Sequence, residues 1–149
     1  TSVDGVNVLL DFGHNPHGAS AILEMARQLR ADGGRMSVCL AQAGDRSEDD
    51  LRDLARVIAE FSPERVFLRD LPEAYHRGRT PEETAEILGR QLIESGLDEE
   101  AVHRASSEVD ALDQGLQWAE PGDLLVHLVH LDRDPMEDAL RARGVELTV

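Results

Sequence analysis

The feature that most constrains the fold is a regular alternation of short apolar runs with longer segments of helical spacing. The apolar runs predict buried strands over residues 6–10, 36–41, 65–68, 102–105 and 124–129. Such alternation is typical of a parallel sheet whose crossover helices cover both faces. We therefore predict a doubly wound α/β fold, with a mainly parallel sheet of about six strands and an edge strand over residues 145–149.

Helical spacing predicts helices over residues 19–31, 48–60, 82–94, 108–119 and 136–143. Their starts are marked by N-cap residues: Asn15 before Pro16, and Ser47, Thr80, Ser107 and Asp134, each followed three residues later by an acid. No linker or repeat interrupts this order. We expect one domain over residues 1–149.

Composition excludes several function classes. The net charge of −15 argues against nucleic acid and anionic membranes as partners, and no run is long enough to span a membrane. All 15 basic residues are arginine, so a P-loop lysine or a lysine base cannot come from this chain. Cys39, the single cysteine, lies in an apolar run, which predicts an inert thiol buried in the core. We expect a cytoplasmic protein.

Polar side chains follow the predicted strands where each strand ends. Asp11 and His14 follow the first strand, Asp45 and Arg46 follow the second, and Arg77 and Arg79 precede the third helix. In a parallel sheet these loops open on one edge beside helix N-termini, which favour phosphate oxygens. Each residue taken singly could instead cap a turn or form an ion pair. Together they favour a nucleotide or phosphorylated ligand.

Two histidine patterns resemble metal-ligand spacing but predict no metal site. Asp11, His14 and His17 are spaced three residues apart, and His127 precedes His130 at the end of a strand. The helix starting near His17 should turn its side chain away from Asp11, and His127 alternates with apolar neighbours in its strand. We expect no metal ligands in the chain.

The segment Asp11-Phe12-Gly13-His14-Asn15-Pro16 resembles the Asp-(Tyr/Gly)-Ala-His-Asn-Pro element that opens the C-terminal domain of Mur ligase family enzymes. The cyanophycin synthetase and folylpolyglutamate synthase branches are the nearest. Further similarities follow in the family's order, at Gly44-Asp45-Arg46, Arg77-Gly78-Arg79 and Pro121-Gly122-Asp123. The resemblance covers nearly the whole chain.

This resemblance implies a Rossmann-like domain excised from a larger ATP-dependent ligase. In such enzymes a central P-loop ATPase domain, which also holds most of the Mg²⁺ contacts, makes an acyl phosphate from a small-molecule carboxylate, and an amine substrate attacks it. The C-terminal domain closes over ATP and helps to bind the amine. By that likeness the nucleotide would be contacted by Asp11, His14 and Asn15, and the substrate by Asp45, Arg46, Arg77 and Arg79. No catalytic residue is expected in the isolated chain.

The sequence also departs from the family pattern. Phe12-Gly13 replaces the usual Tyr-Ala, and the absence of Asp-Asn-Pro-Arg disfavours the diaminopimelate-adding branch. Two alternatives stay open. One is a metal-dependent phosphoesterase, because His14-Asn15-Pro16-His17-Gly18 is similar to a His-Asn-Pro-Asp-Gly element, although His17 replaces its aspartate. The other is a non-catalytic interaction module with the same fold.

Overall fold

The computed structural model describes residues 1–129, 131 and 133–147, and its strands form one six-stranded sheet. The sheet order is β1-β2-β6-β3-β4-β5, and all neighbouring pairs are parallel except β1 and β2. The strands are β1 (Ser2–Val3), β2 (Val6–Asp11), β3 (Met36–Leu40), β4 (Arg65–Arg69), β5 (Val102–Ala105) and β6 (Leu124–Leu128). The predicted α/β class and mainly parallel sheet are confirmed.

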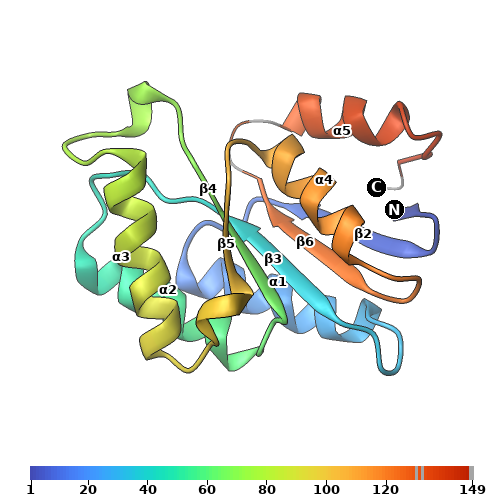
Figure 1. Ribbon diagram of the computed structural model, residues 1–149, viewed down its shortest axis with the longest axis horizontal. Helices are drawn as coiled ribbons and strands as arrows, with labels where there is room; N and C mark the ends of the chain where they lie inside the picture. Colours follow the sequence, from blue (N-terminus) through green and yellow to red (C-terminus); the bar gives the residue numbers. More distant parts are fainter. Residues whose placement is uncertain (130, 132, 148–149) are drawn as a thin grey trace.

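Helices cover both faces of this sheet, as predicted (Figure 1). They are α1 (Pro16–Leu29), α2 (Glu48–Glu60), α3 (Pro81–Glu94), α4 (Glu108–Trp118) and α5 (Arg133–Arg141), with short 3₁₀ turns η1 (Glu73–Tyr75) and η2 (Glu99–Ala101). The first three helices pack on one face around Leu23, Leu54 and Leu88. The last two pack on the other face around Leu112 and Leu140.

The edge strand was predicted at the wrong end of the chain. Residues 145–147 form no strand; Val145 and Leu147 instead pack against the core beneath α4 and α5, while residues 148–149 lie outside the described residues. The edge strand is β1, which turns back through Asp4-Gly5 to pair with β2. Both turn residues have positive φ angles, 49° and 85°, as a two-residue hairpin requires. The sequence signal for this hairpin is the Asp4-Gly5 pair between Val3 and Val6.

The helix starts follow the predicted capping chemistry with two exceptions. Ser47 and Thr80 form complete capping boxes, and the Asn15 side chain accepts a hydrogen bond of 2.8 Å from the amide of Gly18. Ser107 caps α4, but the carboxylate of Asp110 binds the amide of Ser106 rather than that of Ser107. Helix α5 begins at Arg133, so Asp134 lies in its first turn and not at the N-cap.

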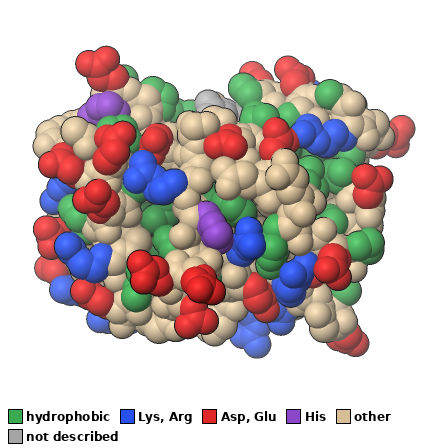
Figure 2. All heavy atoms as spheres, in the orientation of Figure 1, with side chains coloured by type: hydrophobic (Ala, Val, Ile, Leu, Met, Phe, Trp, Pro, Cys, Tyr) green, Lys and Arg blue, Asp and Glu red, His purple; other side chains and the backbone are tan. Residues whose placement is uncertain are grey.

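The surface carries mixed charge on the face that Figure 2 shows, where acidic and basic side chains are interspersed rather than gathered by sign. No helix in the described part of the chain is both long and apolar enough to cross a membrane.

Asp123 fixes the start of β6, the strand that enters the sheet between β2 and β3. Its carboxylate accepts hydrogen bonds from the Arg35 amide at 2.7 Å, the Arg35 guanidinium at 2.7 and 3.0 Å, and the Glu120 amide at 2.9 Å. Burial alone would raise the pKa of Asp123, but the hydrogen bonds from Arg35 and Glu120 outweigh it and hold the pKa below its ordinary value. The carboxylate is therefore ionised in the folded protein near neutral pH.

Replacing Asp123 by asparagine should lower the free energy of unfolding by about 2–4 kcal/mol, because a buried partner of Arg35 loses its charge and one acceptor becomes a donor. The depressed pKa adds stability that is present above about pH 4, the range of an unfolded aspartate, and is lost as the pH falls through the lower folded value. Urea unfolding of both proteins should therefore show a difference at pH 7 that shrinks at pH 3.

Glu120→Gln is the matched control. Glu120 lies 3.9 Å from the same guanidinium, but its side chain is 81% exposed, so its loss should change stability by less than about 0.5 kcal/mol. Equal effects of the two variants would contradict the role given to Asp123.

Candidate functional site

The carboxyl ends of the parallel strands meet at one edge of the sheet, where the predicted site residues lie. Asp11 is the last residue of β2, and its carboxylate accepts a hydrogen bond of 2.5 Å from the amide of Phe12. Its carbonyl accepts a 2.7 Å hydrogen bond from Val129, just beyond β6. Asp11 therefore shapes the loop that leaves β2 and stays partly exposed there.

The loop after β2 is organised around His14. The ring nitrogen Nδ1 lies 3.0 Å from the carbonyl of Phe12, and the two rings pack with their centroids 4.7 Å apart. The carbonyl of His14 accepts a hydrogen bond of 3.0 Å from the side chain of Gln42, which follows β3. Gln42 thus joins the first loop to the loop after β3, a role that the sequence did not indicate.

Asn15 and His17 lie at the start of α1 and differ in their contacts. The Asn15 side chain caps the helix, whereas His17 is exposed within the first turn. Within the described residues, Asp11, His14 and His17 do not form a group of three possible metal ligands. His130, the partner suggested for His127, lies outside the described residues.

The loops after β3 and before α3 are fastened to each other. The amide of Gly44 donates to the carbonyl of Tyr75 at 3.0 Å, and the Arg79 guanidinium donates to the carbonyls of Gly44 and Arg46. Arg77 donates to the Asp45 carboxylate at 2.9 Å, and this guanidinium holds the pKa of Asp45 below its ordinary value. The structure therefore brings Asp45, Arg77 and Arg79 together.

Arg46 differs from the other two arginines of this cluster. Arg79 donates hydrogen bonds to loop carbonyls, and Arg77 donates to the Asp45 carboxylate. The Arg46 side chain, in contrast, is exposed. Among the described residues no carboxylate lies within ion-pair distance of the Arg46 guanidinium. Its five donors are available to an anion from outside the chain.

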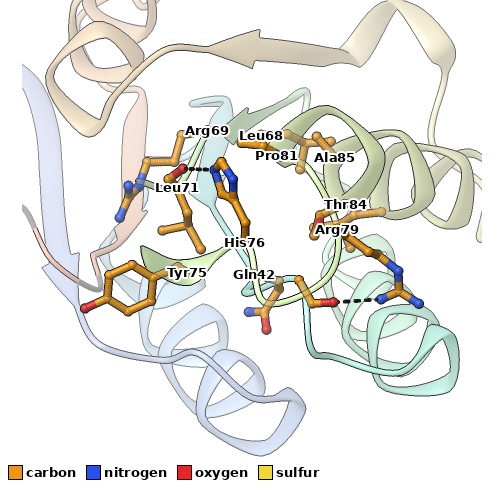
Figure 3. A pocket seen from close by; sticks show the side chains of 12 residues that line it. Gln42, Leu68, Arg69, Leu71, Tyr75, His76, Arg79, Pro81, Thr84 and Ala85 are labelled. Carbon is orange, nitrogen blue, oxygen red and sulfur yellow. Dashed lines mark hydrogen bonds between the residues drawn. The ribbon is translucent and has the colours of Figure 1, made fainter. Parts of the chain in front are cut away.

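A small hollow lies beneath the segment between β4 and α3, and both apolar and polar side chains line it (Figure 3). His76 closes it by placing its ring nitrogen Nε2 3.1 Å from the carbonyl of Leu71, while Arg79 reaches the neighbouring loop. His76 was not among the predicted site residues. Its contact is internal, so it orders the segment that carries Arg77 and Arg79.

Comparison with known proteins identifies the family of the chain. A family model described as the glutamate ligase domain of Mur ligases matches residues 1–128. The chain belongs to the Mur ligase family. The match includes every predicted site residue and ends before α5.

Curated relatives of this Mur ligase domain come from several branches. It is 27% identical over 124 residues to a UDP-N-acetylmuramoyl-L-alanyl-D-glutamate–L-lysine ligase of Enterococcus faecalis, covering 82% of the chain and 24% of that protein. Identity is 21% with the corresponding 2,6-diaminopimelate ligase of Rickettsia typhi (83% and 23% covered) and 24% with cyanophycin synthetase of Geminocystis herdmanii (80% and 13%). The chain thus spans a quarter or less of each relative.

Solved structures share the fold at low sequence identity. A 2,6-diaminopimelate ligase superposes with a TM-score of 0.69 at 15% identity, over 98% of this chain and 31% of that one. E. coli FolC in complex with ADP gives a TM-score of 0.65 at 20% identity, over 92% and 29%. This chain therefore shares the fold of about a third of each of these proteins.

The contact between the loop after β3 and the loop before α3 predicts that Gly44 tolerates no side chain. A Cβ added there would lie 1.7 Å from the carbonyl oxygen of His76, a backbone atom that can move only with its segment. Gly44→Ala should lower the free energy of unfolding by about 1–3 kcal/mol and speed amide hydrogen exchange over residues 75–79.

Gly18→Ala is the control for that change. An added Cβ would meet nothing closer than 3.4 Å, and Gly18 already lies in α1, where alanine is the better helix former. Its stability should stay the same or rise. Unchanged exchange over residues 75–79 in Gly44→Ala would contradict the fastening of the two loops.

Proposed function

We propose that this chain is the C-terminal domain of an ATP-dependent, amide-forming Mur-type ligase, where it closes over ATP and helps to bind the amine substrate. One observation carries the proposal. Hydrogen bonds join three loops at the carboxyl edge, those after β2, after β3 and before α3, into one surface, and the Arg46 side chain is exposed on it. Open α/β sheets bind ligands at such an edge.

The first loop supports the nucleotide side of the proposal. Asp11, His14 and Asn15 occupy the turn between β2 and the N-terminus of α1, where a ribose hydroxyl can meet a carboxylate and phosphates can meet helix amides. Asn15 acts by capping α1 and so holding those amides in place. Asp11 and His14 set the shape of the loop that closes on the nucleotide.

The second loop supports the substrate side. A guanidinium binds a carboxylate through two parallel hydrogen bonds, and the amine substrates of acid–amino-acid ligases carry a carboxylate. Arg46 is the residue proposed for that contact. Asp45, Arg77 and Arg79 hold the Arg46 loop in position, which assigns them a positioning role in substrate binding.

The remaining chemistry belongs to a partner domain. The chain contains no lysine, so a P-loop lysine has to come from a central ATPase domain of the same protein, which would also bind most of the Mg²⁺. Closure of the two domains excludes water from an acyl phosphate that would otherwise hydrolyse. The domain therefore contributes binding and closure rather than catalysis on its own.

In the complete ligase, Asp11→Asn and His14→Ala should each reduce ATP-dependent amide formation by roughly 100-fold, the loss typical of a positioning contact in a closed site. Melting temperatures should fall by only a few degrees, because both residues lie in a partly exposed loop. Turnover and thermal unfolding are measured on the same preparations. Arg56→Ala, an exposed change on α2, is the control, and turnover equal to that control would overturn the nucleotide role.

Arg46→Ala and Arg79→Ala should separate binding from loop positioning. Arg46→Ala should raise KM for the amine at least about 10-fold while leaving thermal unfolding unchanged, since the side chain contacts only the ligand. Arg79→Ala should lower the melting temperature as well, because Gly44 and Arg46 lose a donor to their carbonyls. An unchanged KM in Arg46→Ala would assign the carboxylate contact to another residue.

A further inference from the structure

A second cluster of polar side chains lies inside the molecule, on the face of the sheet that α4 covers. Cys39 of β3 and His127 of β6 are register partners on neighbouring parallel strands, so their side chains project from the same face. Glu108, the first residue of α4, lies over them, and Arg69 ends β4 beside it. All four residues are buried, with at most 4% of each exposed.

The carboxylate of Glu108 has two different surroundings. Its Oε1 accepts a hydrogen bond of 2.6 Å from Nε of Arg69. Its Oε2 faces the sheet, where it accepts a hydrogen bond of 3.5 Å from Sγ of Cys39 and lies 3.7 Å from Nδ1 of His127. Glu108 thus pairs with Arg69 through one carboxylate oxygen and turns the other toward Cys39 and His127.

His127 is the member of this cluster whose bonding is incomplete. Its side chain is 2% exposed, and Nδ1 has no hydrogen-bond partner among the described residues. The distance to Oε2 is too long for a hydrogen bond. A buried nitrogen without a partner is costly and rare in native proteins, and it calls for a ligand that the protein atoms do not supply.

We propose that Cys39, Glu108 and His127 bind one divalent cation of the zinc class. Their ligand atoms, Sγ, Oε2 and Nδ1, all lie within 4.8 Å of one another. Bond lengths of about 2.0–2.3 Å in a tetrahedral zinc site separate the ligand atoms by about 3.3–3.8 Å, the range in which both distances from Oε2 fall. The third pair, Sγ of Cys39 and Nδ1 of His127, lies within 4.8 Å.

The chemistry of the donor set selects this class of metal. A thiolate, an imidazole and a carboxylate together suit Zn²⁺ better than Mg²⁺ or Ca²⁺, which prefer oxygen ligands alone. Arg69 fixes the orientation of the carboxylate through Oε1 and leaves Oε2 toward the metal, as outer partners of metal ligands commonly do. A cation here would tie β3 and β6 to α4 and so stabilise their packing.

The simplest test uses Co²⁺ as a spectroscopic probe for the zinc site. The reduced chain, freed of metal with a chelator, is titrated with Co²⁺, and we expect one equivalent to produce a near-ultraviolet thiolate-to-cobalt band with the visible bands of tetrahedral cobalt. Zn²⁺ should abolish these bands by displacement and should raise the melting temperature, because it binds only the folded state. A folded chain that shows no thiolate band would overturn the proposal.

Variants identify the ligands. Cys39→Ala removes the thiol with little change of volume, so it should fold, lose the near-ultraviolet band and bind Zn²⁺ at least about 100-fold more weakly in competition with a colorimetric chelator. His17→Ala, which removes an exposed histidine of α1, is the control and should bind as the unchanged chain does. Affinity of Cys39→Ala within twofold of the unchanged chain would assign the metal to surface carboxylates and overturn the site.

Discussion

The architecture depends on the way β6 enters the sheet between β2 and β3. A strand that inserts between two others must pair on both sides at once. Asp123 helps to fix where β6 begins, because its carboxylate accepts hydrogen bonds from the backbone amide and the guanidinium of Arg35, just before β3. The Arg35 guanidinium also stacks on Trp118, 4.3 Å from the ring centroid, and donates to the carbonyl of that residue. One ion pair thus connects β3, β6 and the end of α4.

The opposite ends of the same strands carry the proposed binding surface. With β6 in register, Val129 reaches the carbonyl of Asp11, and Gln42 reaches that of His14. The loops after β2 and β3 are therefore held against each other although β6 separates their strands in the sheet. A binding surface made by cross-linked loops on a rigid edge suits a domain that must close on a ligand as a unit.

Arginine supplies all the basic side chains of this surface, and the individual residues have different tasks. Arg79 satisfies loop carbonyls, Arg77 neutralises Asp45, and Arg46 remains exposed for an external anion. The proposed division between positioning and binding follows from these contacts. The motif Gly44-Asp45-Arg46 does not reveal this division, because it holds one residue proposed for positioning, Asp45, beside one proposed for binding, Arg46.

The sequence by itself determined the class of the fold, most of the helix starts and the edge of the sheet at which the candidate residues gather. Those features depend on local signals, such as the apolar runs, the capping residues Ser47 and Thr80, and strand ends that share a direction. The Asp4-Gly5 turn that forms the β1 hairpin is also a local signal, whereas the apolar run that starts at Val145 forms no strand in residues 145–147, because an apolar run need not be a strand.

Only the tertiary structure decided which residues meet. The three residues of the proposed metal site, Cys39, Glu108 and His127, are far apart in the chain. The local sequence around each predicts only an ordinary core residue or helix start. Their proximity follows from the pairing of β3 with β6 and from the packing of α4 over both strands. The same holds for Asp45 with Arg77 and for Arg79 with Gly44, because loop contacts depend on strand order, which local spacing does not encode.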